Sequence, residues 1–406
     1  MQKVAILGGL GIEGRALQKY LRKTQPDLRP VVLDRKLDPN YLSRLKEFDL
    51  IYRTPGVLCN LPEIRKAIRR GVKFSSSINL FFEKAQGIII GITGSKGKGT
   101  TAQILYEILK NAGKDAYLGG NIGNSPLDFV DELTKNSLTV LELSNLQLWD
   151  IKYSPHIAVV LDIFPEHLDW HKSFREYVQS KTGIVKYQRR GDLVFYIAGN
   201  KFSKKIANKS KGKKIEVKPH SLPKKSLMIP GKHNLKNASM AAAVCSHLGV
   251  SPDTILHALS RSKGLPYRLQ MIREAGGVIY YNDSASTTPE TAVVAVKAFP
   301  KSPKILLLGG RDKNSNYTIL EKGLRGEKIK LAVIFGTSKK KINSAIKQTV
   351  KTRLAKDLMS AVETARKIAR PGDIVLFSPG ATSLDMFKNY QDRGAQFNKI
   401  VKKIRG

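Results

Sequence analysis

Residues 87 to 110 read Gly87-Ile-Ile-Ile-Gly-Ile-Thr-Gly-Ser-Lys-Gly-Lys-Gly-Thr-Thr-Ala-Gln-Ile-Leu-Tyr-Glu-Ile-Leu-Lys110. The apolar run at the start predicts a buried strand, and the last nine residues predict a helix. Between them Gly91, Gly94 and Gly97 let backbone N–H groups close around phosphate oxygens, and Lys98 can reach a terminal phosphate. The segment therefore predicts an α/β domain with a nucleoside triphosphate site.

This loop departs from the usual P-loop pattern. Gly99 stands where a Ser or Thr would hold Mg²⁺, so Thr100 must supply any hydroxyl. An ordinary glycine-rich turn between strand and helix is the alternative, but strand, turn, lysine and helix follow in the order that phosphate binding requires. Further on, Glu142 ends an apolar run. A lone carboxylate there suits Mg²⁺ binding, and a surface Glu at a strand end is the alternative.

Length and cysteine content limit the class of protein. The 406 residues are enough for two or three domains. Cys59 and Cys245 lie far apart and lack metal-ligand spacing, which favours a reducing cytoplasm over a disulfide framework. The N-terminus enters a predicted strand directly, and no apolar run approaches about 20 residues. We therefore expect a soluble cytoplasmic protein without membrane insertion.

The formal net charge of +37 is extreme. It is compatible with nucleic acid, an anionic membrane surface or an acidic small-molecule substrate. Ten lysines lie between Lys201 and Lys225 with one acid, Glu216, so we expect an exposed hairpin or loop there. Most of the excess charge is dispersed lysine, which favours a solvated surface that also attracts anionic substrates. A nucleic-acid-binding NTPase remains the alternative in a different class.

Strands and helices alternate along the chain, which predicts parallel α/β sheets. Val4-Ala-Ile-Leu7 precedes a glycine turn and a helix, and the next strand ends at Asp34, where dinucleotide-binding folds place an acidic ribose ligand. A structural βα turn explains this first pattern about as well. We expect three α/β domains: a Rossmann-like domain (1–80), a central P-loop ATPase-type domain (81–265) and a C-terminal doubly wound domain (266–406).

Polar loops follow three predicted strands of the third domain: residues 282–288, 309–313 and 378–383. Ligands of open α/β sheets bind at the carboxyl ends of strands, so these loops should face one site. In the central domain His167, Asp169 and His171 cluster after a strand, which fits either a metal site or a polar loop. Lys181 lies beyond them on a helix predicted over residues 174–185.

Together these residues resemble the Mur ligases of peptidoglycan synthesis. The resemblance covers nearly the whole chain in order, and several of its motifs are long. They are residues 91–101 quoted above, Gly-Gly-Asn-Ile-Gly (119–123), Leu-Glu-Leu-Ser-Asn-Leu-Gln-Leu (141–148), Pro-Glu-His-Leu-Asp-Trp-His (165–171), Gly-Lys-His-Asn-Leu-Lys-Asn (231–237), Tyr-Asn-Asp-Ser (281–284) and Leu-Phe-Ser-Pro-Gly-Ala-Thr-Ser-Leu-Asp-Met-Phe-Lys-Asn-Tyr (376–390).

The resemblance implies an ATP-dependent amide ligase that acts through an acyl phosphate. Its expected substrates are UDP-N-acetylmuramoyl-L-alanine and D-glutamate. L-Glutamate or another acceptor is the alternative, because Ala285 and Thr288 stand where some members have Lys and Asn. The implied catalytic residues are Lys98, Glu142, His167 and Lys181. The resemblance further implies two Mg²⁺ ions, one held by Thr100 and Glu142 and one by His167 and a carbamylated Lys181.

The enzyme is expected to be a monomer. The remaining site residues that the resemblance implies fall into three groups. The ATP group is Gly94, Ser95, Lys96, Gly97, Lys98, Gly99, Thr100, Thr101, Asn234, Asn237, Arg268 and Asp283. The UDP-substrate group is Gly11, Ile12, Glu13, Asp34, Arg35, Thr54, Gly56, Asn121 and His167. The glutamate group is Thr287, Lys313, Ser383, Leu384 and Tyr390.

Overall fold

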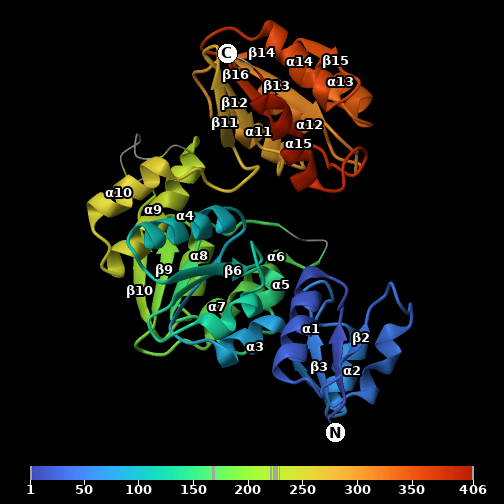
Figure 1. The fold of residues 1–406 in the computed structure, drawn as a ribbon, viewed down its shortest axis with the longest axis vertical. Helices are drawn as coiled ribbons and strands as arrows, with labels where there is room; N and C mark the ends of the chain where they lie inside the picture. Colours follow the sequence, from blue (N-terminus) through green and yellow to red (C-terminus); the bar gives the residue numbers. More distant parts are fainter. Residues whose placement is uncertain (1, 167–169, 220–221, 223–226, 228, 405–406) are drawn as a thin grey trace. The chain divides into compact units, whose positions relative to one another are not determined.

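The computed structural model describes residues 2–166, 170–219, 222, 227 and 229–404. Three sheets and the helices between them make up the fold (Figure 1). The chain forms two compact units, Met1–Pro223 with Lys236–Leu259, and Lys224–Leu235 with Ser260–Gly406. The predicted α/β class is confirmed, while the domain boundaries at residues 80 and 265 stay predictions.

The first sheet has four parallel strands in the order β2-β1-β3-β4. Its first three strands follow the predicted pattern, and β4 was not predicted. Because all strands run the same way, the turns after β1, β2 and β3 meet at one edge. The elements are β1 (Val4–Leu7), α1 (Ile12–Thr24), β2 (Val31–Leu33), η1 (Tyr41–Glu47), β3 (Leu50–Arg53), α2 (Pro62–Arg69), β4 (Lys73–Ser75) and α3 (Ser77–Lys84).

The second sheet has six parallel strands in the order β10-β9-β8-β5-β7-β6. Strand β5 lies between β8 and β7, so the glycine-rich loop leaves the sheet near its centre. The elements are β5 (Ile88–Thr93), α4 (Lys98–Asn111), β6 (Ala116–Gly120), η2 (Pro126–Asp128), η3 (Val130–Glu132), β7 (Leu138–Glu142), α5 (Asn145–Leu148), β8 (Ile157–Val160), α6 (Phe174–Lys181), α7 (Gly183–Lys186), β9 (Leu193–Ile197), α8 (Lys201–Ala207), β10 (Lys213–Val217), α9 (Lys232–His247) and α10 (Pro252–Arg261).

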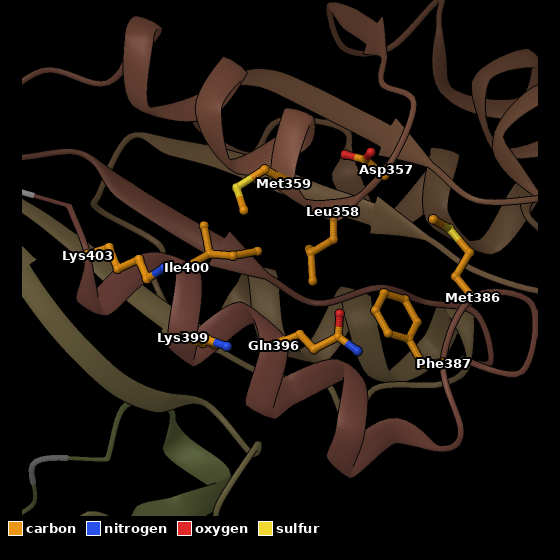
Figure 2. A pocket seen from close by; sticks show the side chains of 9 residues that line it. All are labelled: Asp357, Leu358, Met359, Met386, Phe387, Gln396, Lys399, Ile400 and Lys403. Carbon is orange, nitrogen blue, oxygen red and sulfur yellow. The ribbon is translucent and has the colours of Figure 1, made fainter.

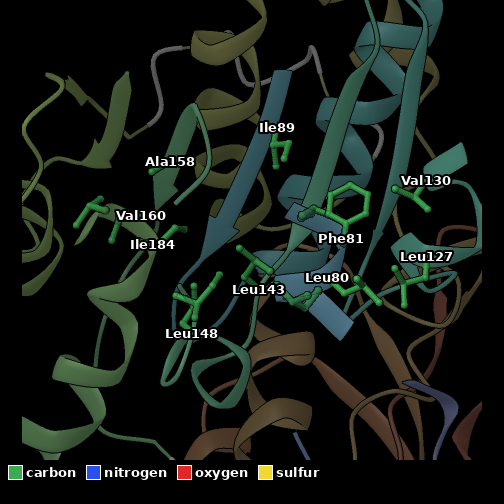
Figure 3. Close-up of a cluster of buried hydrophobic side chains, with 14 of the residues drawn as sticks. Leu80, Phe81, Ile89, Leu127, Val130, Leu143, Leu148, Ala158, Val160 and Ile184 are labelled. Carbon is green, nitrogen blue, oxygen red and sulfur yellow. The ribbon is translucent and has the colours of Figure 1, made fainter. Parts of the chain in front are cut away.

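One hydrophobic core joins the first two sheets. It combines Ile6 and Leu17 of the first sheet's layers with Phe81 of α3 and Val160 of β8, all buried. Figure 3 shows Leu80 and Phe81 of α3 near Leu143, which directly follows β7. Burial of about 25 cal/mol per Å² of apolar surface stabilises this arrangement, so the first two sheets belong to one compact unit.

The lysine-rich segment is not the hairpin or loop that its composition suggested. Residues 201–207 form helix α8, and residues 213–217 form β10, which pairs in parallel with β9. Ile206 and Ala207 are fully buried while the lysines of both elements are exposed. The prediction was wrong because a charge run was given more weight than the apolar residues spaced within it.

The third sheet has the order β11-β12-β16-β13-β14-β15. The four predicted strands are present and parallel, while two edge strands were not predicted. Strand β11 is antiparallel to β12, so the sheet is mixed. The elements are β11 (Gln270–Ala275), β12 (Val278–Asn282), α11 (Pro289–Lys297), β13 (Lys304–Gly309), α12 (Thr318–Leu324), β14 (Ile329–Phe335), α13 (Lys339–Ile346), β15 (Thr352–Leu354), α14 (Leu358–Ile368), β16 (Ile374–Phe377) and α15 (Tyr390–Lys402).

Two further expectations can be compared with the described part of the chain. Cys59 and Cys245 are both free, as expected. No helix among the described ranges is both long and apolar enough to cross a bilayer.

Candidate functional site

The glycine-rich loop connects β5 to the N-terminus of α4. Gly97 precedes the helix in the left-handed region at φ +86°, and a Cβ there would lie 2.4 Å from Asn237 Oδ1. The position therefore requires glycine, and it brings the predicted Asn237 against the loop. The N-cap residue Gly97 has no side chain with which to cap α4, so the first N–H groups of this helix suit an anion. Gly99 and Thr100 lie in the first turn, and Thr101 is fully buried behind them.

Two lysine side chains converge on one carbonyl of this loop. Lys98 Nζ donates to the oxygens of Gly94, at 3.1 Å, and Ser95, at 3.0 Å. Lys181 Nζ, from the C-terminal end of α6, donates to the same Gly94 oxygen at 2.9 Å. Residues 83 positions apart in sequence therefore place two ammonium groups beside the predicted phosphate site.

Lys181 is the most perturbed of these groups. Its side chain is fully buried, with Nζ 4.7 Å from the centre of the Tyr177 ring. Burial, together with the positive charge of Lys98, holds the pKa of Lys181 well below its usual value, although Glu166 and Glu142 act in the opposite direction. The amine is consequently easier to deprotonate than an exposed lysine, which is the form that reacts as a nucleophile.

Glu142 lies where the magnesium prediction requires a carboxylate. It ends β7 and pairs with Ile92 of β5, two residues before Gly94. Its side chain is buried, and Asn121 Nδ2 donates to Oε1 at 3.1 Å. The predicted substrate residue Asn121 is thus next to the predicted metal ligand.

The oxygen donors of Thr100 and Glu142 fit Mg²⁺, which binds one or two carboxylates together with substrate phosphates. In the described ranges no three His, Cys, Asp or Glu side chains group closely enough to hold a metal by themselves. His167 and Asp169 lie outside the described residues. His171 is described and buried, where its Nε2 is 2.7 Å from Asn145 Nδ2.

Ser95 and Lys96 hold the loop against the segment after β8. The Ser95 hydroxyl donates to Phe164 O at 2.9 Å and lies 3.0 Å from the Tyr177 hydroxyl. Lys96 forms an ion pair with Glu166. These contacts fix the loop on the side from which Lys181 approaches.

The predicted UDP-substrate residues other than Asn121 and His167 gather at one edge of the first sheet. Asp34 Oδ2 accepts from the N–H of Leu10, at 3.2 Å, and Thr54 Oγ1 donates to Gly8 O at 3.1 Å. The turns after three strands therefore meet, as the parallel topology predicts. Four predicted residues are exposed on these turns: Gly11, Ile12, Arg35 and Gly56.

Glu13 differs from those four residues because it is enclosed. It accepts hydrogen bonds from Ser77 Oγ, at 2.6 Å, and Gln147 Nε2, at 2.7 Å. Burial raises the pKa of the Glu13 carboxyl, against the lowering effect of these bonds. Glu13 thus links α1 to α3 and α5, and a role in substrate binding stays a prediction.

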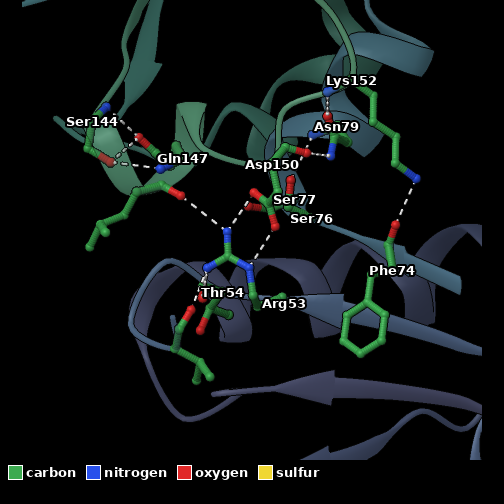
Figure 4. Close-up of polar contacts among 12 residues, drawn as sticks. Arg53, Thr54, Phe74, Ser76, Ser77, Asn79, Ser144, Gln147, Asp150 and Lys152 are labelled. Atoms are coloured by element: carbon green, nitrogen blue, oxygen red, sulfur yellow. Dashed lines mark hydrogen bonds and ion pairs between the residues drawn. The ribbon is translucent and has the colours of Figure 1, made fainter. Parts of the chain in front are cut away.

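Arg53 is a functional candidate that the sequence did not single out. Its guanidinium forms a two-pronged ion pair with Asp150, with Nε–Oδ2 at 2.7 Å and Nη2–Oδ1 at 2.6 Å. Nη1 also donates to the oxygens of Thr54, at 3.0 Å, and Val57, at 2.5 Å (Figure 4). It therefore ties the predicted UDP loop to the segment after α5. The sequence did contain one signal for Arg53, namely a positively charged residue at the end of an apolar strand.

In the second unit the three polar loops do meet. Asp283 Oδ2 accepts from Ser286 Oγ, at 2.5 Å, and from Ser378 Oγ, at 2.8 Å. Arg311 N donates to Thr382 O at 2.7 Å, which joins the other pair of loops. The loops after β12, β13 and β16 therefore contact one another, and that they face one ligand site stays a prediction.

The predicted residues on and near these loops differ in exposure. Ser383 is buried, and Thr287 and Tyr390 are partly buried. Lys313 and Leu384 are exposed, as is Arg268. Asn234, near the start of α9, donates from Nδ2 to Pro230 O at 2.7 Å.

A separate groove of about 500 Å³ lies between α14 and α15 (Figure 2). Its lining includes Met359, Met386 and Phe387 together with Lys399 and Lys403. It contains none of the predicted glutamate residues, so it is distinct from the loop site.

Family models of known proteins match two separate segments of the chain. The model for the Mur ligase middle domain matches residues 92–226, and that for the Mur ligase glutamate ligase domain matches residues 267–380. A protein of Ruminiclostridium cellulolyticum named UDP-N-acetylmuramoylalanine–D-glutamate ligase is 32% identical over 100% of this chain and 97% of its own. A protein of the same name from Clostridium kluyveri is 33% identical over 98% and 96%.

Among solved structures, the MurF ligase of Thermotoga maritima in complex with ADP is similar in fold. Its TM-score is 0.62 at 18% identity, over 88% of this chain and 90% of that one. The sheets and the phosphate loop define an ATP-binding α/β ligase of the Mur type. The chain belongs to the Mur ligase family, and its full-length relatives carry the name of the D-glutamate-adding member.

Proposed function

We propose that this enzyme uses ATP to join D-glutamate to UDP-N-acetylmuramoyl-L-alanine in peptidoglycan precursor synthesis. The observation that carries the proposal is the convergence of Lys98 and Lys181 on the Gly94 carbonyl beside Glu142. Phosphoryl transfer requires charge neutralisation and alignment more than a reactive side chain, and this cluster can supply both. The names of the full-length relatives support the choice of substrates.

The reaction has two steps. An oxygen of the substrate's alanyl carboxylate attacks the γ-phosphorus of ATP, which releases ADP and leaves an acyl phosphate. The amine of glutamate then attacks the acyl carbon, phosphate departs and the nitrogen loses a proton. Lys98 would stabilise the negative charge that develops on the γ-phosphoryl oxygens, because a preorganised ammonium group in a site shielded from water acts strongly there.

Thr100 and Glu142 would hold one Mg²⁺, and His167 with a carbamylated Lys181 would hold a second. When bound, such ions neutralise phosphate charge during transfer. The lowered pKa of Lys181 supports carbamylation, since the neutral amine is the form that attacks CO₂. Asn121, one hydrogen bond from Glu142, would orient the acceptor substrate beside the metal site.

The other groups would divide the substrates between them. Asn234, Asn237, Arg268 and Asp283 would complete the ATP site, and the turns carrying Asp34 and Thr54 would bind uridine diphosphate. Lys313 would pair with a glutamate carboxylate, a charge-assisted contact. We place the reaction in the cytoplasm, where Cys59 and Cys245 stay reduced, and we expect a monomer.

The experiment that tests the function is phosphate release with ATP, Mg²⁺ and UDP-N-acetylmuramoyl-L-alanine. Parallel reactions contain D-glutamate, L-glutamate or no amino acid. We expect release that depends on D-glutamate. Release only with L-glutamate would keep the ligase reaction and overturn the stereochemistry, whereas no dependence on either amino acid would overturn the proposal.

Replacing Lys98 tests the phosphate site itself. We expect Lys98→Ala to reduce glutamate-dependent phosphate release by about 10³-fold, because a transition-state contact worth roughly 4 kcal/mol is removed. The matched control is Lys110→Ala, an exposed lysine in the last turn of the same helix. Unchanged circular dichroism in both variants shows that the fold survives. Substantial activity in Lys98→Ala would contradict the role.

A further inference from the structure

Arg393 is a fully buried arginine beneath the three loops of the second unit. It lies in the first turn of α15, three residues after Tyr390. Its Nε donates to Ser284 Oγ at 3.0 Å and its Nη2 to Ser284 O at 2.8 Å. The Ser284 hydroxyl in turn donates to Tyr390 O at 2.9 Å. Arg393 is therefore bound twice to the loop after β12, and that loop holds the predicted glutamate residue Tyr390.

The same guanidinium reaches the other two loops. Nη1 donates to Ala381 O, at 3.0 Å, and to Gly309 O, at 3.4 Å. Gly310 has φ +143°, and a Cβ there would lie 2.9 Å from Nη1 and 2.1 Å from Thr382 O. The backbone thus closes around the guanidinium as tightly as glycine permits. One side chain connects the loops that carry Thr287, Lys313 and Ser383.

All these acceptors are neutral. Within the described residues Arg393 forms no ion pair, and Asp283 and Asp385 act on it only at longer range. Burial lowers the pKa of Arg393 to about 10, so the group still carries its charge at neutral pH. This positive charge below the loops is only partly offset by Asp283 and Asp385, and it favours an anionic ligand above the loops because buried charge is weakly screened.

We propose that Arg393 is the positioning residue of the glutamate pocket: it sets the register of all three loops and supplies the positive field that favours a dicarboxylic amino acid. This inference rests on the proposed function. It predicts an effect on the affinity for glutamate that exceeds any effect on ATP or the UDP substrate. A residue that only stabilised the fold would not separate the three substrates in this way.

Three variants and one control test the inference. Arg393→Lys keeps the charge but loses the planar guanidinium whose three nitrogens bond to the three loops, and Arg393→Met removes both the charge and the hydrogen bonds. Ser284→Ala removes only one acceptor and keeps Arg393, so it provides a milder change if the arginine variants fold poorly. The control is Arg273→Met, since partly buried Arg273 anchors the opposite end of α15 through Lys402 O, at 2.7 Å.

The measurement is the set of KM values and kcat from phosphate release, with the Tm of each variant. We expect the KM for D-glutamate to rise about 10-fold in Arg393→Lys and about 100-fold in Arg393→Met. The KM for the UDP substrate should stay within about twofold, and the KM for ATP should rise less than that for glutamate, because Asp283 of the predicted ATP group adjoins Ser284. Ser284→Ala should raise the KM for D-glutamate about threefold, and Arg273→Met should leave this KM unchanged.

Equal increases in all three KM values, or a fall in kcat with an unchanged KM for glutamate, would overturn the inference. So would an unchanged KM in Ser284→Ala together with arginine variants that do not fold. The wild-type reactions separate the two claims. A wild-type enzyme without glutamate-dependent release overturns both the function and the inference, whereas a glutamate-dependent enzyme with unchanged variants overturns only the inference.

Discussion

Lys181 illustrates how a buried amine becomes reactive. Burial and the charge of Lys98 lower its pKa, so the unfolded chain binds more protons than the folded chain at pH values between the folded pKa and about 10.5. The contribution of this group to stability therefore rises with pH across that window. Protonation of Lys181 opposes folding, and the proposed carbamylation would replace the unfavourable cation by an anion beside Lys98.

Bicarbonate should therefore support activity through Lys181. We expect removal of dissolved CO₂ at mildly acidic pH to reduce phosphate release and added bicarbonate to restore it. In ¹³C-bicarbonate the wild-type enzyme should show a carbamate NMR signal that Lys181→Arg lacks. Lys186→Ala, an exposed lysine of α7, is the matched control and should keep the signal. Activity that ignores bicarbonate, with no carbamate signal, would contradict this prediction.

Asp283 should make the second unit's stability depend on pH. Burial raises its pKa from 3.8 to about 6, although hydrogen bonds from Ser286 and Ser378 lower it. The folded state holds the Asp283 proton more tightly than the unfolded state does. The contribution of this proton to the free energy of unfolding is therefore fully present below about pH 4 and disappears as the pH rises through about 6. A shift of about two units corresponds to about 3 kcal/mol.

Asp283→Asn cannot titrate and should lack this pH dependence. We expect the unfolding free energy of wild type relative to the variant to fall by about 3 kcal/mol between pH 4 and pH 7. Hydrogen exchange of the β12 amides measures it. Glu363→Gln, at an exposed site on α14, should show no such change. A constant difference between wild type and Asp283→Asn would rule out a proton on Asp283.

The sequence singled out Lys98 and Glu142 because the roles proposed for them depend on neighbours in sequence: a strand, a glycine turn and a helix. Arg53 and Arg393 were missed for a physical reason. Each acts through carbonyl oxygens of distant segments, such as Leu146 O for Arg53 at 3.1 Å and Gly309 O for Arg393. Carbonyl acceptors are present in every residue, so their positions appear only once the chain is folded.

Among the elements, the parallel strands were predictable and the edges were not. Strands β5, β7 and β8 are buried on both faces and read as apolar runs. Edge strand β10 reads Lys-Lys-Ile-Glu-Val, with exposed lysines that protect an open edge from pairing with another chain. A strand with that role resembles a loop in composition, which is why its residues predicted a hairpin or loop.

The Arg53–Asp150 pair should stabilise the connection between β3 and α5. Arg53 is 2% exposed, so Arg53→Ala leaves a partly buried carboxylate without its partner, and we expect a loss of about 3 kcal/mol. Arg53→Lys should not restore it, because an ammonium group cannot bond both carboxylate oxygens in this planar geometry. Hydrogen exchange of the β1 and β3 amides gives the free energy.

The control for this pair is Arg44→Ala, which breaks the exposed Arg44–Glu47 pair and should cost under about 1 kcal/mol. A double-mutant cycle with Asp150→Ala isolates the interaction. If the coupling energy between Arg53 and Asp150 is no larger than the cost of breaking the Arg44–Glu47 pair, Arg53 stabilises the fold through packing alone.

The net charge of +37 belongs to the whole molecule and suggests an alternative function. If the lysines of α8 and β10 form a nucleic-acid site, they should dominate binding to polyanions. If the charge is a dispersed solvating surface, any three exposed lysines should be equivalent. Affinity for DNA falls with salt with a slope of about 0.9 per phosphate contact, so the slope counts the lysines involved.

Two triple variants distinguish these cases on a DNA column across a salt series. One replaces Lys204, Lys211 and Lys213 by Ala, and the other replaces Lys340, Lys347 and Lys351, all exposed. We expect both to elute earlier by the same amount, all proteins to be released below physiological salt, and ligase activity to be unchanged. Because the two sets carry equal charge, only a dedicated site can make them differ. A larger effect of the first set, with wild type retained at physiological salt, would favour nucleic-acid binding.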